Sequence, residues 1–181
     1  MERNLTMVAL FAALIAALGL VPSLTLGFGV PITAQTLGVM LAGTVLGAKR
    51  GALAALLIVV LVALGLPLLA GGRGGLGIFT SPTAGFLLGW PLGAFVTGLI
   101  TDKTRQLPLS VSAIIGAVIG GIGIVYLCGV IGMSIVLDKT LIEATWLVTA
   151  FIPGDVVKAV LAGFITQGLA KARPQSVLTR H

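Results

Sequence analysis

Asp155 and Lys158 lie three residues apart in the otherwise apolar segment FIPGDVVKAVLAGFITQGLA, close to the end of the chain. Ionised side chains at membrane depth are costly, so a chain that keeps two of them must offer each a partner, water or a ligand. The i, i+3 spacing places both on one face of a helix. The pair therefore presents a carboxylate acceptor and a three-donor cation, side by side, to a small and partly polar solute.

Two structural interpretations compete with a ligand site at this pair. Asp155 follows Pro153 and Gly154 at the predicted start of a helix, where a carboxylate can cap free N–H groups and complement the helix dipole. Lys158 opposes that dipole in the first turn, and it could pair with Asp155 alone or extend to the outer headgroups. As a ligand, an amide- or urea-like group or a carboxylate on an apolar body would suit the pair. A phosphate would demand more cations than Arg73 supplies.

A glycine-rich loop, AGGRGGLGIFTSPT, is the second candidate binding feature. Glycine lets a loop backbone approach a ligand closely, while Arg73 adds a cation and Thr80 a hydroxyl. The loop is not a P-loop, because the Gly-Lys-Ser/Thr ending is missing. A flexible outer connection with a solvated Arg73 is the alternative. Gln35 and Thr36, at the outer end of an apolar segment, could face a cavity or make helix–helix hydrogen bonds.

Composition places the chain in a lipid bilayer. Of its 181 residues, 57% are hydrophobic and 9% are charged, and the mean hydropathy is +1.18, whereas soluble domains carry about 25% charged residues. The net charge of +6 invites a nucleic-acid partner, but the charges lie between apolar spans and have a topological explanation. The sequence has no nucleophile–base set, metal-ligand spacing or nucleotide motif. We therefore expect neither an enzyme nor a bound metal or cofactor.

Six apolar segments reach the length that crosses a bilayer. They cover about residues 5–21, 32–48, 51–66, 83–100, 109–136 and 153–170, and a short surface helix that carries Trp146 is expected within residues 138–152. The pattern predicts an all-α fold, an integral membrane bundle of six transmembrane helices, in a single domain over residues 1–181.

The positive charges predict the orientation of this bundle. With the N-terminus in the cytoplasm, Arg73 and Lys139 lie in outer loops and Lys158 lies near the outer end of the last helix. The remaining cations all fall inside: Arg3, Lys49, Arg50, Lys103, Arg105, Lys171, Arg173 and Arg180. Because cytoplasmic loops carry the excess of Lys and Arg, both termini are expected to be cytoplasmic.

Small residues at a spacing of four predict close helix contacts. The stripes are Ala9, Ala13 and Ala17; Gly85, Gly89 and Gly93; and Gly116 with Gly120. Such stripes let backbones approach closely, and packing within the bundle is their simplest use. The alanine stripe could instead dock another membrane subunit.

Three segments in order, VPITAQTLGVMLAGTVLGAKRGALA, GLPLLAGGRGGLGIFTSPTAGFLLGWPLGA and FIPGDVVKAVLAG, resemble the BioY family. These proteins are the biotin-binding S components of energy-coupling factor (ECF) transporters in prokaryotes. The resemblance runs from about Leu5 to Ala170. It implies a six-helix bundle in the cell (inner) membrane, with biotin bound near the extracellular side. The candidate binding residues are Asp155, Lys158, Arg73, Gly74, Gly75, Gln35 and Thr80.

The resemblance also implies partners. A transmembrane T component would dock on Ala9, Ala13 and Ala17 and couple the chain to two cytoplasmic ATPases. Some family members are thought to work without that module as oligomers, so a stand-alone homo-oligomer is an alternative. Other function classes are a proton-coupled carrier of another small solute or a channel that uses Asp155, a membrane enzyme for lipid-like substrates, and a ligand-free scaffold.

Overall fold

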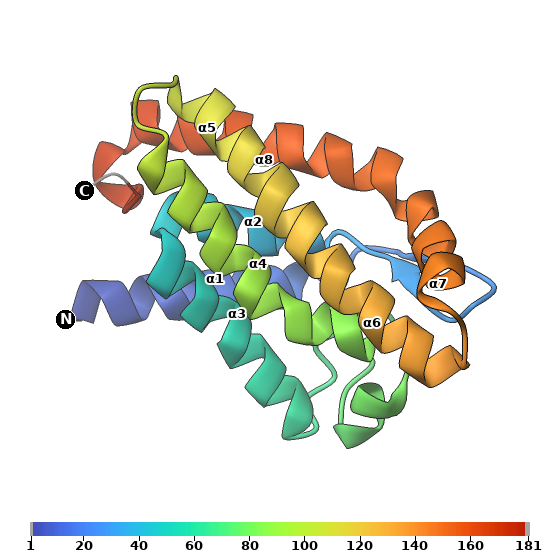
Figure 1. The fold of residues 1–181 in the computed structure, drawn as a ribbon. Helices are drawn as coiled ribbons and strands as arrows, with labels where there is room; N and C mark the ends of the chain where they lie inside the picture. The colour runs from blue at the N-terminus through green and yellow to red at the C-terminus, as the bar shows by residue number, and fades with distance from the viewer. Residues whose placement is uncertain (1, 180–181) are drawn as a thin grey trace.

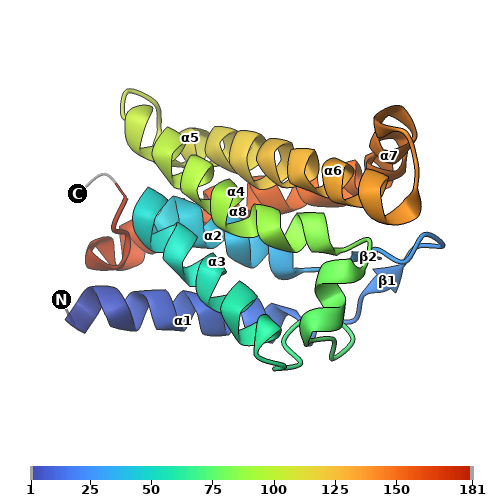
Figure 2. The ribbon, with the colours of Figure 1, turned by 60° about the horizontal axis from the view of Figure 1, so that its bottom comes forward.

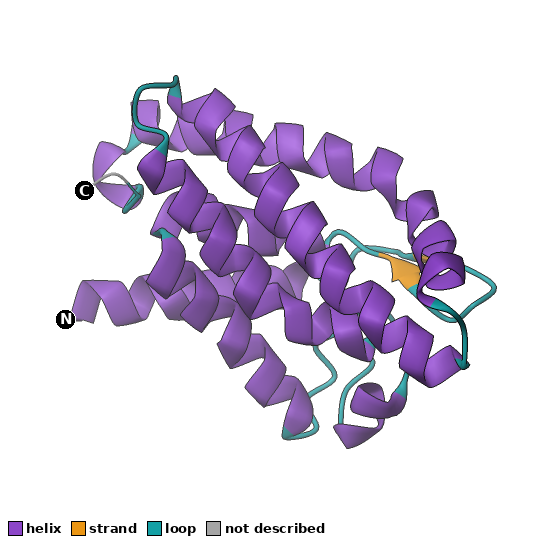
Figure 3. Ribbon diagram, in the orientation of Figure 1, coloured by secondary structure: helices purple, strands orange, loops and turns teal. Residues whose placement is uncertain are grey.

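The computed structural model describes residues 2–179, which fold into a bundle of helices (Figures 1 and 3). The long helices are α1 (Glu2–Leu18), α2 (Gln35–Leu46), α3 (Ala48–Ala63), α4 (Ala84–Lys103), the continuous helix α5–η2–α6 (Leu109–Gly116, Ala117–Ile124 and Val125–Leu137) and α8 (Ile152–Ala172). Short elements connect them: β1 (Leu24–Thr25), β2 (Pro31–Ile32), η1 (Leu76–Thr80), α7 (Leu141–Val148), η3 (Thr149–Phe151) and η4 (Pro174–Ser176). The predicted all-α bundle of six long helices is confirmed over these residues.

The second and third helices begin at other residues than predicted. Helix α2 starts at Gln35 rather than near residue 32, because Pro31–Ile32 pairs antiparallel with Leu24–Thr25. Gly47 separates α2 from α3 with a φ of +83°, a conformation that only glycine adopts readily. Lys49 and Arg50 therefore lie in the first turn of α3, and not between two helices as the predicted segments 32–48 and 51–66 had placed them.

The outer surface of the bundle is apolar, as a lipid environment requires. Large hydrophobic side chains are exposed on the outer helices, among them Leu53, Leu92, Ile135 and Phe164. By length and composition, three helical stretches of the described chain are able to cross a membrane: Ala84–Lys103, Leu109–Leu137 and Leu141–Ala172. Helix α2 is shorter, with ten of its twelve residues buried, so it is the central helix of the bundle.

Glycines hold α4 against the long helix α5–η2–α6. A Cβ atom on Gly85 would lie 2.2 Å from the Cys128 carbonyl oxygen, and one on Gly93 would lie 2.9 Å from the Gly120 carbonyl oxygen. A Cβ atom on Gly120 would in turn meet the Thr97 backbone nitrogen at 2.4 Å. Both predicted glycine stripes thus lie in the contact between these two helices, and they meet at Gly93 and Gly120. They let the two helices pack at backbone contact, the arrangement that supplies dispersion energy in lipid.

The long helix contains a π-helical stretch at its centre. Residues Ala117–Ile124 form η2, between the α-helical parts α5 and α6. Gly121 faces the Met40 side chain of α2, where a Cβ atom would lie 2.5 Å from Cγ. A π-helical stretch usually marks a local adjustment of a helix to its neighbours, and here it accompanies contacts with both α2 and α4.

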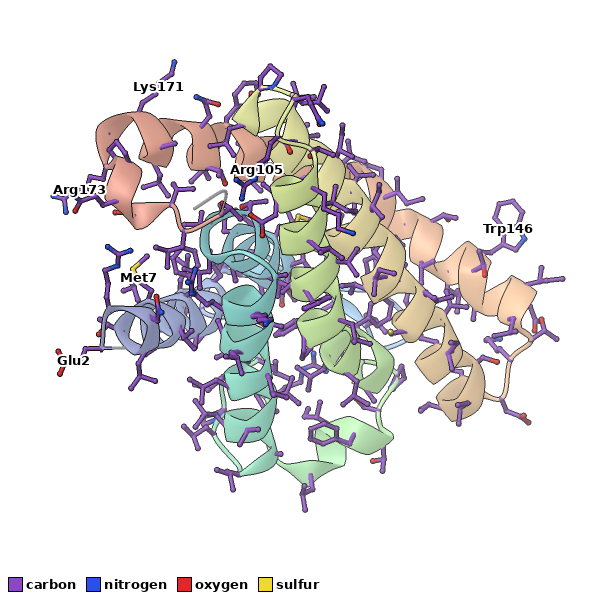
Figure 4. All side chains as sticks on the ribbon, turned by 60° about the vertical axis from the view of Figure 1, so that its left-hand side comes forward. Glu2, Met7, Arg105, Trp146, Lys171 and Arg173 are labelled. Carbon is purple, nitrogen blue, oxygen red and sulfur yellow. The ribbon has the colours of Figure 1, made fainter. Side chains whose placement is uncertain are left out.

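Both termini lie at one end of the bundle, and most of the basic residues gather there. Figure 2 shows α1 on one side of the molecule and α5–α6 on the other, with α2 between them. Figure 4 labels Arg105, Lys171 and Arg173 near the end that carries Glu2, and Trp146 far from them. Trp146 is 72% exposed on α7, as expected for the predicted surface helix. Arg180 lies outside the described residues. The direction in which this basic end faces in the membrane stays a prediction.

The segment after α8 folds back onto the bundle. Val177, Leu178 and Thr179 are all buried. The Leu178 and Thr179 backbone N–H groups donate to the Val45 carbonyl at 2.7 and 3.1 Å, and Thr179 Oγ1 donates to the Thr44 carbonyl at 2.5 Å. The last carbonyl groups of a helix need such partners, so the segment caps the C-terminal end of α2.

Candidate functional site

A pocket is lined by residues at the starts of α2, α4, α6 and α8. Figure 1 shows the two termini at the other end of the bundle. The volume of the pocket is about 590 Å³, counting the space at its mouth. The walls come from the entry to α2, the glycine-rich loop after α3, the first half of α4, and the starts of α6 and α8. Small-molecule sites are concave and combine an apolar lining with a few polar groups, so the pocket is the candidate site for a small solute.

Asp155 and Lys158 line this pocket from the first two turns of α8. Lys158 Nζ lies 2.7 Å from Asp155 Oδ1. The N-cap position of α8 is Phe151, and the Asp155 carboxylate is directed at side chains of other helices. The capping interpretation of Asp155 is therefore wrong. Because α8 begins at Ile152, Lys158 lies in its second turn rather than in its first.

The pair belongs to a network that joins three helices. Thr36 Oγ1 of α2 donates to Asp155 Oδ1 at 3.0 Å, and Tyr126 Oη of α6 donates to Asp155 Oδ2 at 2.6 Å. Lys158 Nζ donates to the Thr33 carbonyl at 2.5 Å and to Thr36 Oγ1 at 3.0 Å. Charge-assisted hydrogen bonds of this kind are stronger than neutral ones, so the network fixes the carboxylate and the ammonium group in the pocket wall.

Counting donors and acceptors shows what this network still offers a ligand. The three N–H groups of an ammonium are all used in Lys158, by Thr33, Thr36 and Asp155. A carboxylate has about four acceptor sites. Among the described residues, Asp155 Oδ1 accepts from Thr36 and Lys158, whereas Oδ2 accepts from Tyr126. One acceptor site therefore remains on Oδ2, and it suits an N–H group of a ligand.

Gln35 also lines the pocket, but its amide is committed to the protein. Its Nε2 donates to the Ile15 carbonyl at 3.1 Å and to the Leu68 carbonyl at 3.0 Å. Its Oε1 accepts from the Ala70 backbone N–H at 3.0 Å. Both amide N–H groups are thus used, and Gln35 ties α1, α2 and the glycine-rich loop together beneath the pocket.

Arg73 projects from the glycine-rich loop to the pocket. Gly71 and Gly72, with φ of +76° and +70°, make the tight turn that precedes it. The Arg73 side chain donates to the Ala70 carbonyl and to Thr83 Oγ1, each at 3.2 Å. Burial lowers the pKa of the Arg73 guanidinium, yet arginine remains charged at neutral pH. Its remaining N–H groups can face an anion at the pocket.

Three other predicted binding residues lie outside the pocket wall as it stands. Gly74 packs on the chain at Leu66, since a Cβ atom there would lie 2.2 Å from the Leu66 carbonyl oxygen. Gly75 has a φ of +83° and precedes η1. Thr80 donates to the Gly77 carbonyl at 3.0 Å on the exposed side of η1. Their role in binding stays a prediction.

Aromatic side chains form the apolar part of the pocket. Phe86, Tyr126 and Phe151 meet edge to face, with ring centroids 5.8 to 6.4 Å apart. Phe28 packs edge to face on Phe151 at 6.0 Å from behind the pocket. Trp90 adds its indole ring from α4. The pocket thus combines one polar wall with an apolar interior, an arrangement that orients a partly polar solute.

Sequence reasoning did not identify Phe86 and Phe151 as pocket residues. One signal for the residues on α4 was present. Thr83, Phe86 and Trp90 lie at positions i, i+3 and i+7, which share one helix face. For Phe151 no such signal exists, because it lies in the short turn η3 before α8.

The comparisons with known proteins point to one family. The model of the BioY family matches residues 2–175. The chain is 56% identical to "Biotin transporter BioY" of Rhodobacter capsulatus over 189 residues, covering 99% of this chain and 100% of that one. It is 51% identical to the protein of the same name from Rhizobium etli, covering 95% of each chain.

A solved structure matches the fold as well. It is the crystal structure at 2.1 Å of the S component for biotin from an ECF-type ABC transporter. The TM-score is 0.88 at 32% sequence identity, and the match covers 94% of this chain and 92% of the other. The likeness therefore extends over nearly the whole bundle.

Proposed function

The chain belongs to the BioY family, and from that membership and the pocket we propose that it takes up biotin as the S component of an ECF-type transporter. It is a multi-pass protein of the prokaryotic inner membrane and not an enzyme. The observation that carries the assignment to this pocket is the Asp155–Lys158 ion pair in the wall of the largely apolar cavity. Its Lys158 Nζ and Asp155 Oδ1 atoms are 2.7 Å apart.

The polar groups of biotin match the groups that the pocket offers. Biotin carries a ureido ring with two N–H donors and one carbonyl acceptor, a thioether ring, and a valerate chain that ends in a carboxylate. The one acceptor site left on Asp155 Oδ2 suits a ureido N–H. Lys158 can donate to a biotin oxygen only by leaving Thr33, Thr36 or Asp155. Its main role in this proposal is to hold the Asp155 carboxylate ionised and in place.

Arg73 is the candidate partner for the valerate carboxylate. It lies in the loop at the pocket, with N–H groups that neither Ala70 nor Thr83 uses. Arginine binds carboxylates through paired N–H groups. The ring system would then enter the aromatic interior, and the charged end of the chain would stay beside the loop. Gly74, Gly75 and Thr80 would contribute if this loop closes on the ligand.

The proposed partners dock on the exposed, lipid-facing surface of α1. Ala9, Ala13 and Ala17 are exposed on α1, which packs on α2 and α3 with its other face. A stripe of small side chains lets a second membrane helix approach closely. A T component bound there would link the chain to two ATPase subunits. A stand-alone homo-oligomer would use the same exposed stripe.

The orientation is part of this proposal, with both termini in the cytoplasm and the pocket facing outward. A fusion of green fluorescent protein to the C-terminus should fluoresce in whole cells, and a C-terminal alkaline phosphatase fusion should be inactive. Alkaline phosphatase fused after Lys139, in the predicted outer loop, should be active. The reverse pattern would place the pocket on the cytoplasmic side and contradict uptake from outside.

Binding of labelled biotin to the purified protein tests the proposal. The wild-type chain should bind. Asp155→Asn or Lys158→Met should weaken binding by at least about thirtyfold, because each variant leaves the other charged side chain of the pair buried without its partner. Lys139→Met, in the loop before α7, is the matched control and should bind as the wild type does. Equal affinity in all four proteins would refute the site.

Uptake assays separate the remaining alternatives. Uptake that needs a T component and ATP supports the ECF assignment, whereas uptake by the chain alone supports the stand-alone oligomer. Flux that follows the proton gradient and ignores biotin would instead indicate a proton-coupled carrier of another solute.

A further inference from the structure

Trp90 is the described side chain that both lines the pocket and holds a buried polar atom without a hydrogen-bond partner. It lines the pocket from α4, and only 5% of its surface is exposed. Its indole Nε1–H is buried and has no hydrogen-bond partner among the described residues. Among the described residues, Thr97 Oγ1 is the other buried polar side-chain atom without a hydrogen-bond partner. Thr97, however, lies two turns further along α4 and does not line the pocket.

A buried N–H group without a partner is costly, and native structures keep few of them. Tryptophan in a buried position usually finds a partner for this N–H. A phenylalanine would fill an apolar wall without that cost. The presence of tryptophan at the pocket therefore points to an acceptor that arrives with the ligand.

Most other hydrogen-bond donors in the pocket are already bonded to protein groups. All three N–H groups of Lys158 are used by Thr33, Thr36 and Asp155. The hydroxyl groups of Thr36 and Tyr126 donate to Asp155. Arg73 has free N–H groups, but it lies in the loop after α3. The Thr33 and Thr83 hydroxyl groups accept hydrogen bonds from Gln35, Arg73 and Ser81. Among the described pocket residues, the Trp90 indole N–H is thus the buried side-chain donor without any partner.

We propose that the Trp90 indole N–H donates a hydrogen bond to an uncharged acceptor atom on the ring system of the bound solute. This inference rests on the proposed function, and the acceptor in biotin is then the ureido oxygen or the thioether sulfur. A carboxylate is disfavoured, because Leu87, one turn before Trp90 on α4, and Val125 are apolar residues of the same pocket and an anion beside the indole would lack a cation. Trp90 thus distinguishes solutes that carry a neutral acceptor from those of similar shape that do not.

The test removes the N–H group and keeps the ring. In a Trp146→Phe background, Trp90 is the single tryptophan, so β-(3-benzothienyl)alanine supplied in place of tryptophan replaces it alone and puts sulfur where the N–H stood. Trp146 is exposed on α7, away from the pocket, and its replacement should leave binding unchanged. Trp90→Phe in the same background is the second variant. Equilibrium binding of biotin and of dethiobiotin, which lacks the sulfur, is measured for each protein.

The proposal expects both variants to bind biotin about three- to tenfold more weakly than the Trp146→Phe parent, the effect of one neutral hydrogen bond. An equal loss for dethiobiotin would identify the ureido oxygen as the acceptor, and a loss for biotin alone would identify the sulfur. Unchanged affinity in the benzothienyl variant overturns the proposal, whether or not Trp90→Phe binds more weakly. A parent protein that fails to bind biotin at all would instead overturn the proposed function.

Discussion

Tyr126 Oη lies 2.6 Å from Asp155 Oδ2, so a side chain of the aromatic pocket wall also fixes the carboxylate. Tyr126 comes from α6 and Asp155 from α8, and the Phe86 ring of α4 meets the Tyr126 ring edge to face at 6.3 Å. The polar and the apolar walls of the pocket are therefore one structure. A change in the packing of α4 on α6 would move the carboxylate as well.

Tyr126→Phe tests this link. The variant keeps the ring between Phe86 and Phe151 but removes the hydroxyl that donates to Asp155. We expect biotin affinity to fall about three- to thirtyfold, since a hydrogen bond to a charged group is worth more than a neutral one. Tyr126→Leu removes ring and hydroxyl and should fall further. If the phenylalanine variant binds as tightly as the wild type and only the leucine variant fails, the hydroxyl has no positioning role.

The ion pair itself should matter for stability as well as for binding. Removing one partner of a buried pair costs about 3–5 kcal/mol of unfolding free energy, because the other charge stays buried alone. Asp155→Asn and Lys158→Met should each lower the melting temperature in detergent without biotin. The double variant Asp155→Asn/Lys158→Met should recover much of this loss, since neither charge remains. A double variant as unstable as the sum of the single ones would show that the two charges do not interact.

Much of the fold followed from the sequence because the physics behind it is local. A bilayer sets the length of a helix, so the number of long helices and the extent of the helix over 109–137 could be predicted closely. The spacing of Asp155 and Lys158 fixed their common face without any knowledge of the fold. Gly47 was the exception, since its left-handed conformation, rather than the charges of Lys49 and Arg50, separates α2 from α3.

The rest of the site depends on how distant helices pack. Thr36 reaches Asp155 across 119 positions of the sequence and Tyr126 across 29. Those contacts exist because the bundle brings α2, α6 and α8 together in one particular register. Gln35 is similar: its type suggested a pocket residue, but the carbonyl groups of Ile15 and Leu68 take its amide N–H groups. No local pattern encodes such partners.

Gly85→Ala should disturb the register of α4 on α6. The new Cβ atom would lie 2.2 Å from the Cys128 carbonyl oxygen, so the backbone of one helix must move. We expect a loss of about 1–3 kcal/mol of stability, the usual cost of overpacking, together with weaker biotin binding through the shifted Phe86 and Tyr126. Gly168→Ala on α8 is the matched control. No atom lies within 4 Å of its added Cβ, and alanine favours a helix by up to about 1 kcal/mol over glycine. Equal melting temperatures for both variants would contradict this account of the helix contact.

The segment that follows α8 should stabilise the bundle without affecting biotin binding. Deleting residues 177–181 removes the buried side chains of Val177 and Leu178 and the hydrogen bonds to the Thr44 and Val45 carbonyl groups at the end of α2. Burial of one such side chain is worth about 1.5–3 kcal/mol, so the truncated chain should melt at a clearly lower temperature. Its biotin affinity, measured below that temperature, should match the wild type, because the pocket lies at the opposite end of the bundle. Gln175→Ala, an exposed change in the same segment, should alter neither quantity. Loss of affinity in the truncated chain at full stability would instead indicate that the end of α2 is coupled to the pocket along the length of that helix.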